Sequence, residues 1–403
     1  MKTTQILIGM VMLLIACSDS KKQSNQGTKS ASSLEKIIDL EKAIENPIEP
    51  LNLSDFVEDI EYIRPEYPTS LVDIILDVSI NDNHLFLHLL KNRLLCYSRD
   101  GKFLREIGKY GQGPKEHLGI RAMAVRDSLI GINSNWMQKI LWYNLEGNYL
   151  GETPISDNVF RFKVLDKDRI VINPHHGIPI EDPNLFITGI INSKGDTILL
   201  KKSKPYYSKG FSTDLHIWQY NDMIRMSTYV NDTIYSVSKD TVIPTYVIDY
   251  GKYKANQRAF ADSSIWEKEQ HRFIKDLSFC EMNKKMLLKF VYNQKKWYGV
   301  YDKQTGKTSV WSVKPDSINK YGILKGGGWI NDVDGGFSPT FFRSASNDYF
   351  IADVQPNELK AQFSENKRKI KVKHPEKQRK LEQLINSLDD DENPVIVVYK
   401  LKK

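Results

Sequence analysis

The sequence has few cysteines, a small net charge and only one long apolar run. Three cysteines among 403 residues exclude a disulfide-rich scaffold, and Cys96 and Cys280 lack the spacing of metal ligands. We expect these two to be buried thiols in separate elements, with a disulfide between them as the alternative. A net charge of +7 does not favour a nucleic acid as partner. An apolar content of 40%, with 11% aromatics, is sufficient for a large hydrophobic core.

The apolar run is typical of a secretion signal. It extends from Ile6 to Ala16, which is too short to span a bilayer. The residues Leu14-Ile15-Ala16-Cys17 resemble the lipobox of bacterial lipoproteins. The resemblance implies that residues 1–16 are a signal peptide and that Cys17 carries a lipid anchor, which would make the membrane a partner. The alternative is an ordinary signal peptide that contains a cysteine.

Residues 18–33 are polar, small and free of large apolar side chains. We expect residues 17–36 to form a flexible tether before a folded domain over residues 37–403. The residues after Cys17 lack the strongly acidic run associated with the surface export of some bacterial lipoproteins. We therefore expect an anchor in the outer membrane that faces the periplasm, with the cell surface as the alternative.

A hairpin pattern recurs along the folded part. It consists of an aromatic or apolar strand end, a polar turn and a further strand, and its turn residues are Gly101, Gly147, Gly195, Asp240 and Gly306. Glycine, asparagine and aspartate tolerate the positive φ of tight hairpins. The first four turns follow one another at roughly 45 to 48 positions, which is the length of a propeller blade. The pattern predicts an all-β fold, a six-bladed β-propeller of four-stranded antiparallel blades.

The sixth blade must be assembled from both ends of the chain. We expect it to combine residues 328–333, 349–354 and 395–400, with residues 57–63 as the N-terminal strand that pairs with the last segment and closes the ring. Short helical insertions are predicted near residues 256–274 and 357–390. The second has apolar residues at helical spacing; these are Leu381, Leu384, Ile385 and Leu388.

The segment from Asp100 to His117 (DGKFLREIGKYGQGPKEH) resembles a motif of a family of six-bladed, NHL-like propeller lipoproteins from gut-type diderm bacteria. Residues 231–235, 246–251, 331–336 and 393–399 are similar to further segments of that family. His117 stands where the family has a tyrosine, and Arg64-Pro65 replaces an apolar pair. The resemblance implies the fold and an envelope location, and it brings no catalytic residues.

The glycines of this segment do not form a nucleotide site. Gly108, Gly111 and Gly113 have the order GxxGxG, and no Lys-Ser or Lys-Thr pair follows, so neither a dinucleotide fingerprint nor a phosphate loop is present. We expect a sharply turning connection between blades. If it lies at the rim of the central channel, its polar side chains are candidates for ligand binding; these are Tyr110, Gln112, Glu116 and His117.

The histidines do not form a metal-binding motif, since no HxH or HExxH pattern occurs. The adjacent pair His175 and His176, in an expected loop, is the best polar candidate for ligand binding. We predict no metal site, no cofactor and no assignable catalytic residue. Calcium or another divalent metal in the channel remains open as part of an enzymatic alternative.

Trp136 and Trp329 lie in polar or glycine-rich segments, whereas the other tryptophans are expected in the core between blades. An exposed indole beside amides suits stacking against sugar rings or peptide side chains. The favoured function is a monomeric, envelope-anchored binding or scaffolding propeller for a glycan, a peptide or a partner protein. The alternative is a propeller enzyme, a metal-dependent lyase or hydrolase.

Overall fold

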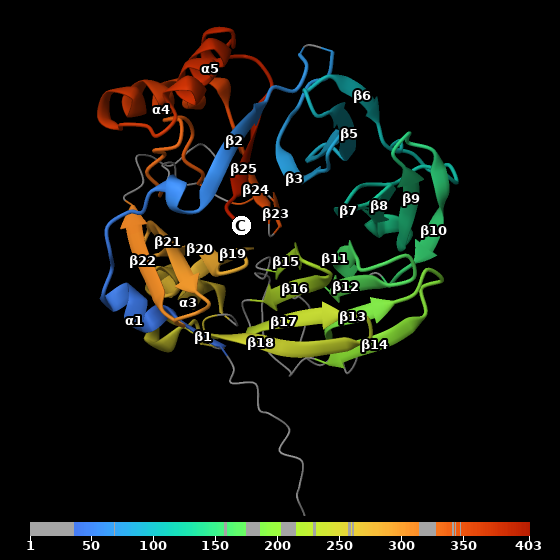
Figure 1. Ribbon diagram of the computed structural model, residues 1–403. Helices are drawn as coiled ribbons and strands as arrows, with labels where there is room; N and C mark the ends of the chain where they lie inside the picture. The colour runs from blue at the N-terminus through green and yellow to red at the C-terminus, as the bar shows by residue number, and fades with distance from the viewer. Residues whose placement is uncertain are drawn as a thin grey trace, which may run out of the picture. The chain divides into compact units, whose positions relative to one another are not determined.

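Short β-strands arranged as six sheets form most of the regular secondary structure from Lys36 onward (Figure 1). The computed structural model describes residues 36–403, except 68, 157–158, 175–185, 203–214, 229–230, 257–258, 260–261, 314–327, 341, 343 and 347. Within this part, each sheet has four antiparallel strands in sequential hairpin order, and one sheet carries a fifth strand. The sheets form the blades of a six-bladed β-propeller, so the predicted fold class is confirmed.

The first three blades follow the chain directly. Their strands are, in blade 1, β3 (Ile75–Ile80), β4 (His84–Leu89), β5 (Arg93–Ser98) and β6 (Phe103–Glu106); in blade 2, β7 (Ala122–Arg126), β8 (Leu129–Ser134), β9 (Lys139–Asn144) and β10 (Tyr149–Pro154); and in blade 3, β11 (Val159–Val164), β12 (Ile170–Pro174), β13 (Phe186–Ile191) and β14 (Thr197–Lys202). In each blade the first strand lies closest to the centre of the ring (Figure 1).

The other three blades include both ends of the described chain. Their strands are, in blade 4, β15 (Leu215–Tyr220), β16 (Met223–Thr228), β17 (Asn231–Ser238) and β18 (Thr241–Asp249), with β1 (Lys36–Asp39) parallel to β18; in blade 5, β19 (Lys275–Glu281), β20 (Lys285–Tyr292), β21 (Lys295–Asp302) and β22 (Thr308–Val313); and in blade 6, β23 (Ser344–Ala345), β24 (Tyr349–Val354), β25 (Val395–Leu401) and β2 (Val57–Ile63).

The blade turns use the glycines that the repeat indicated. Gly101, at φ +94°, shows why: a Cβ there would lie 2.1 Å from the carbonyl oxygen of Arg64. Gly147, Gly195 and Gly306 also have positive φ. In the fourth turn the positive φ was predicted at Asp240, but Lys239, one residue earlier, adopts it.

Strands from both ends of the chain close the ring, as predicted. β2 and β25 pair antiparallel from Val57 opposite Leu401 to Ile63 opposite Ile396. Because β25 is buried from Val395 to Tyr399, a large part of the apolar core depends on this pairing.

The innermost strand of blade 6 is not where the sequence placed it. It is β23, whereas the segment 328–333 contributes only an isolated bridge between Ile330 and Asn52. The side chain of Asn331 accepts hydrogen bonds from the backbone amides of Val333 and Asp334, which folds the segment into turns. Asn and Asp side chains compete in this way with strand pairing.

Helices occur in the two insertions where they were expected, and the structure adds α1, which was not predicted. α1 (Leu40–Glu45) is capped by Asp39, and α3 (Ser263–Glu269), in the first insertion, is capped by Asp262. The C-terminal insertion forms α4 (Pro356–Lys369) and α5 (Pro375–Asn386), with Leu381, Ile385 and Leu388 in the core. Over the described part of the chain, no helix has both the length and the apolar character needed to cross a membrane.

The two cysteines of the propeller are buried free thiols, as predicted. Cys96 and Cys280 belong to separate apolar clusters, so they do not form a disulfide with each other. Burial raises the pKa of the Cys96 thiol to about 11 and that of Cys280 further.

Candidate functional site

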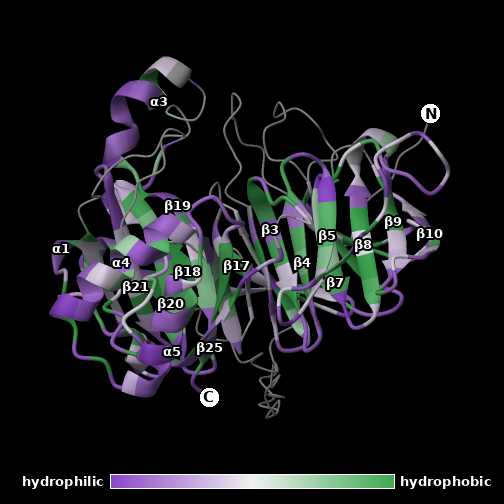
Figure 2. Ribbon diagram, turned by 90° about the horizontal axis from the view of Figure 1, so that it is seen from above, coloured by the Kyte–Doolittle hydropathy of each residue, from purple (hydrophilic) through white to green (hydrophobic). Residues whose placement is uncertain are grey.

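The two ends of the blades differ in what connects the strands. Because all blades have the same strand order, their innermost strands run in the same direction. We call the end at which these strands begin the connection face. The segment 107–121, α3 and the α4–α5 insertion all leave from this face, whereas the turns at the opposite end are short. Figure 2 shows α3 beyond the ends of the strands. Binding residues often lie on such connections, where a rigid scaffold positions them.

A cavity of about 620 Å³ lies between the innermost strands, and we call it the central cavity. Residues of β3, β7, β11, β15 and β19 line it, together with Ser346, which follows β23. Its size is that of a small-molecule site. One residue of β20, Lys289, also lines the cavity. The polar and charged lining residues on these six strands are Asp77, Ser79, Arg126, Arg161, Lys163, His216, Gln219, Asp276, Ser278 and Lys289.

Positive charge exceeds negative charge in this lining. Of its charged side chains, four are lysine or arginine and two are aspartate. Arg161 and Lys163 form no salt bridge with any residue of the described chain. Arg126 also forms no salt bridge with the described chain, and its guanidinium donates a hydrogen bond to the carbonyl oxygen of Val164 at 3.1 Å. The central cavity therefore has unneutralised cations.

Arg161 shares an aromatic ring with a second arginine. Its guanidinium carbon lies 5.5 Å from the centroid of Phe160, and that of Arg121 lies 5.2 Å from the same centroid. Desolvation lowers the pKa of Arg121. The ring stabilises each cation modestly, and it leaves both charges without an anion.

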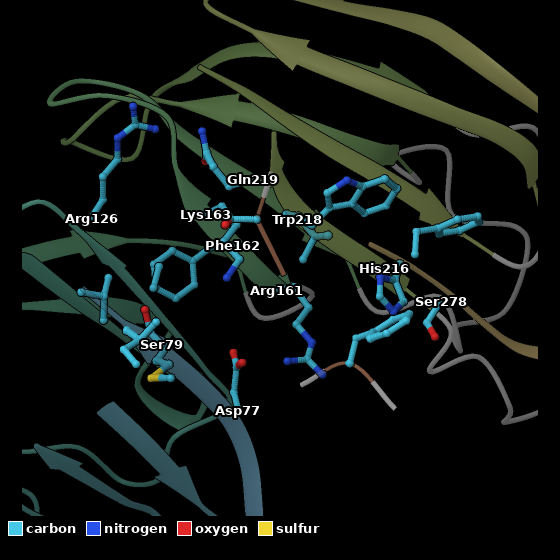
Figure 3. Close-up of a pocket in the computed structure, with 18 of the residues that line it drawn as sticks. Asp77, Ser79, Arg126, Arg161, Phe162, Lys163, His216, Trp218, Gln219 and Ser278 are labelled. Carbon is cyan, nitrogen blue, oxygen red and sulfur yellow. The ribbon is translucent and has the colours of Figure 1, made fainter. Parts of the chain in front are cut away.

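His216 is the neutral polar group beside Arg161. Burial and the positive charges of Arg161 and Lys289 lower the pKa of His216 to about 4, so the imidazole is uncharged at neutral pH. Its Nδ1 has no hydrogen-bond partner. The ring packs edge-on against Trp218 and Phe279. Figure 3 shows Asp77, Arg161 and His216 on one side of the cavity and Arg126 and Gln219 on the other.

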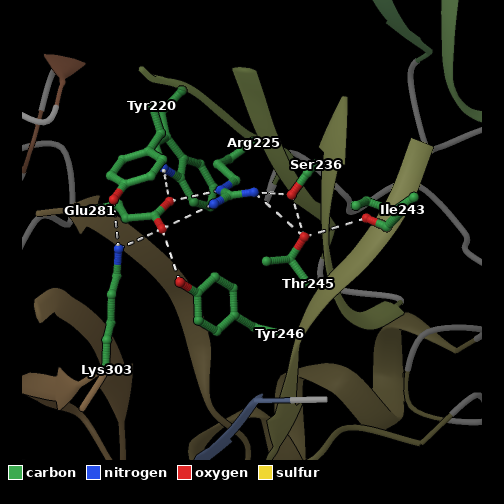
Figure 4. A network of polar contacts seen from close by, with 9 residues as sticks. Tyr220, Arg225, Ser236, Ile243, Thr245, Tyr246, Glu281 and Lys303 are labelled. Carbon is green, nitrogen blue, oxygen red and sulfur yellow. Dashed lines mark hydrogen bonds and ion pairs between the residues drawn. The ribbon is translucent and has the colours of Figure 1, made fainter. Parts of the chain in front are cut away.

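A buried ionic network fixes the wall that carries His216 (Figure 4). The Glu281 carboxylate accepts hydrogen bonds from Trp218 Nε1 at 3.2 Å, Tyr246 Oη at 3.0 Å and Lys303 Nζ at 2.8 Å. Arg225 also pairs with it, and the side chain of Glu281 is fully buried. The network joins β15, β16 and β18 of blade 4 to β19 of blade 5, which positions the strands behind the cavity.

The predicted residues of the 107–121 segment lie together but outside the cavity lining. Tyr110 forms a bridge with His117 and is 66% exposed, and Gln112 is exposed. Glu116 accepts a hydrogen bond from the amide of Gly113. His117 is fully buried with neither ring nitrogen partnered, and burial lowers its pKa. The segment is the sharply turning connection that its glycines indicated.

The two candidate tryptophans have opposite environments. Trp136 is 78% exposed at the connection face, in the turn between β8 and β9. Trp329 is 5% exposed and packs edge-on against Trp311 and Phe56, with centroid distances of 4.7 and 5.3 Å. The expected exposure of Trp329 is therefore wrong, because the aromatic core between blades 5 and 6 covers its ring. Stacking on a ligand remains a hypothesis for Trp136.

The remaining predicted positions lie outside the described residues. They are Cys17, with the signal peptide and most of the tether, and the pair His175 and His176. In the described chain, no group of three or more His, Cys, Asp or Glu side chains is arranged to hold a metal ion.

The sequence predicted a ligand at the central channel but did not identify the residues that line the cavity, because they come from every blade. Asp77, Arg161 and His216 belong to no local motif, since each lies on a separate repeat. The signal that indicates them is positional: each is a polar residue near the start of the first strand of its blade.

The fold and the cavity define a six-bladed β-propeller with a polar central cavity. The chain belongs to the family described as "Domain of unknown function (DUF4934)", whose model matches residues 35–400. This agrees with the expected uncharacterised family of six-bladed propellers.

One of two similar solved structures supports the fold. A crystal structure of a Bacteroides fragilis protein, named "Putative exported protein", has a TM-score of 0.69 at 18% identity and covers 91% of this chain and 99% of its own. A member of the DUF4221 family from Bacteroides vulgatus has a TM-score of 0.48 at 9% identity, and covers 86% of this chain and 98% of its own. No curated protein matches the sequence.

Proposed function

We propose that this protein is an exported, lipid-anchored binding protein that holds a small ligand in its central cavity. The observation that carries the proposal is the lining: innermost strands of different blades direct charged and polar side chains into one space of about 620 Å³. Arg161 and Lys163 are half-buried cations that form no salt bridge with the described chain. A ligand that carries negative charge or acceptor groups would complete their contacts.

Filling the cavity tests its role. Ser79→Trp places an indole in the lining, and Gln304→Trp places the same side chain on an exposed turn of blade 5 as the control. The unfolding midpoint of each protein is measured with neutral and acidic oligosaccharides, short peptides, calcium and zinc. A bound ligand at about a hundred times its Kd stabilises the fold by roughly 2.7 kcal/mol, so binding is detectable.

We expect at least one compound to raise the midpoint of the wild type and of Gln304→Trp, and to leave that of Ser79→Trp unchanged. A shift that persists in Ser79→Trp would place the ligand elsewhere. The absence of any shift in the wild type would contradict small-ligand binding.

The lipid anchor rests on the lipobox-like residues before Cys17, and the neighbour from Bacteroides fragilis is itself named as exported. We propose attachment to the outer membrane, facing the periplasm. Detergent phase partitioning of the full chain tests the anchor. We expect the wild type in the detergent phase and Cys17→Ser in the aqueous phase; equal partitioning of both proteins would contradict lipidation.

A further inference from the structure

We propose that the central cavity binds the oxyanion of an acidic saccharide, a carboxylate or a sulfate ester, through Arg161 and Lys163. This inference rests on the proposed function and names the class of ligand. Both residues lie on β11 and line the cavity. Their separation by two positions puts them on one face of the strand, about 6 to 7 Å apart along it.

The charge balance calls for an anion. Arg161 and Lys163 form no salt bridge with the described chain, and Arg121 adds a third cation across the ring of Phe160. Like charges held close together repel each other more strongly in a partly desolvated site than in water. An oxyanion between them would replace repulsion with charge-assisted hydrogen bonds.

The acidic residues of the lining do not supply that anion. The carboxylate of Asp77 lies in the same part of the cavity as Arg161 (Figure 3), but it accepts a hydrogen bond from the amide of Val78 and forms no salt bridge with a described residue. Asp276 is exposed at the start of β19. The positive charge therefore remains for a ligand.

The uncharged part of the lining favours a hydroxylated ligand. Ser79, Gln219 and Ser278 present hydroxyl and amide groups. Such groups donate to and accept from sugar hydroxyls. A volume of about 620 Å³ has room for a disaccharide.

Titration calorimetry with matched disaccharides tests the proposal. The probes are digalacturonate, a sulfated digalactose, neutral digalactose and the acidic peptide triglutamate. The proteins are the wild type, Arg161→Gln, Lys163→Gln, the double variant, and Arg379→Gln as the control. Arg379 is exposed on α5 and loses the same charge outside the cavity.

We expect an acidic disaccharide to bind the wild type and Arg379→Gln with equal affinity, and neutral digalactose to bind at least tenfold more weakly. Each cavity substitution should weaken binding by about tenfold or more, which is the usual effect of losing a hydrogen bond to a charged group. Arg161→Lys keeps the charge and loses the planar fork, so it should bind with intermediate affinity. Higher ionic strength should weaken binding further.

The arms of the experiment separate the sources of the anion. Tighter binding of digalacturonate assigns a carboxylate, and tighter binding of the sulfated sugar assigns a sulfate ester. If neutral digalactose bound as tightly as the two acidic disaccharides, and the double variant kept its affinity, the oxyanion proposal would be overturned. The cavity would then remain a binding site for uncharged saccharides. Binding of triglutamate alone, lost on substitution of Arg161, would overturn the saccharide class. No binding of any acidic probe would also overturn the proposal.

The variants also separate binding from folding. Because Arg161 and Lys163 have no carboxylate partner in the described chain, their removal should leave the unfolding midpoint of the free protein unchanged or higher. A lower midpoint together with unchanged affinity would show that these side chains stabilise the structure instead of binding the ligand.

Discussion

Nε of Arg225 donates a hydrogen bond to Oε2 of Glu281 at 3.0 Å, across the boundary between blades 4 and 5. Both side chains are buried, and Glu281 also receives hydrogen bonds from Trp218, Tyr246 and Lys303. Removing one partner of a buried ion pair leaves the other charge without compensation. We therefore expect Glu281→Leu to lower the free energy of unfolding by about 3–5 kcal/mol, measured by urea denaturation.

A surface ion pair provides the control. Arg93 and Glu106 are 3.1 Å apart, and each side chain is 35% exposed. Glu106→Leu should therefore cost less than about 1 kcal/mol. Similar losses for the two variants would contradict the role given to the buried network.

His216 should make stability depend on pH. Its pKa is about 4 in the folded protein, below the ordinary value of 6.5, because burial and two neighbouring cations disfavour its charged form. The unfolded chain therefore binds more protons between these values, and stability is lost as the pH falls from about 6.5 toward 4. A shift of this size corresponds to about 3 kcal/mol.

The comparison that isolates this effect is His216→Gln. Urea denaturation at pH 7 and pH 4.5 should show a smaller loss for the variant, since His88 and His117 contribute to both proteins. An equal loss in the two proteins would contradict the depressed pKa of His216.

Trp136 and Trp329 should respond in opposite ways to the same substitution. Trp329→Ala removes a ring buried against Trp311 and Phe56, and should cost about 3–5 kcal/mol in the free energy of unfolding. Trp136→Ala removes an exposed ring and should change it by less than about 0.5 kcal/mol. If Trp136 stacks on the ligand, Trp136→Ala should bind the ligand more weakly at unchanged stability. Equal stability losses for the two variants would contradict the burial of Trp329 and the exposure of Trp136.

The two buried thiols should resist modification until the protein unfolds. In the Cys17→Ser variant only Cys96 and Cys280 remain, and burial raises both pKa values, which keeps the thiols protonated. We expect no reaction with a thiol reagent at pH 8 in native buffer, and two thiols per chain in denaturant. A single reactive thiol under native conditions would show that one of the sites opens.

The architecture was readable in the sequence because a propeller repeats its local signals. Gly101, Gly147, Gly195 and Gly306 mark turns whose backbone has a positive φ, and the spacing of the first three gives the blade length. The terminal strand over residues 395–400 is apolar and needs a partner, which the 57–63 segment supplies. These are properties of short segments, and they do not depend on distant contacts.

Features set by distant contacts were not readable. β23 has only two residues, too few for a strand pattern, and β1 is placed by its pairing with β18. Trp329 lies in a glycine-rich segment that suggests exposure, but Phe56, next to β2, and Trp311 of β22 cover it. The lining of the central cavity was missed for the same reason, because Asp77, Arg161 and His216 meet only when the ring closes.

Amide hydrogen exchange with and without digalacturonate tests the central claim most directly. Ligand binding in the central cavity predicts slower exchange in β11 (Val159–Val164) and β15 (Leu215–Tyr220), which supply Arg161, Lys163 and His216, and no such change in Ser79→Trp. Protection confined to the 107–121 segment and the turn around Trp136 would contradict the account, because it would place the ligand on the connection face outside the cavity.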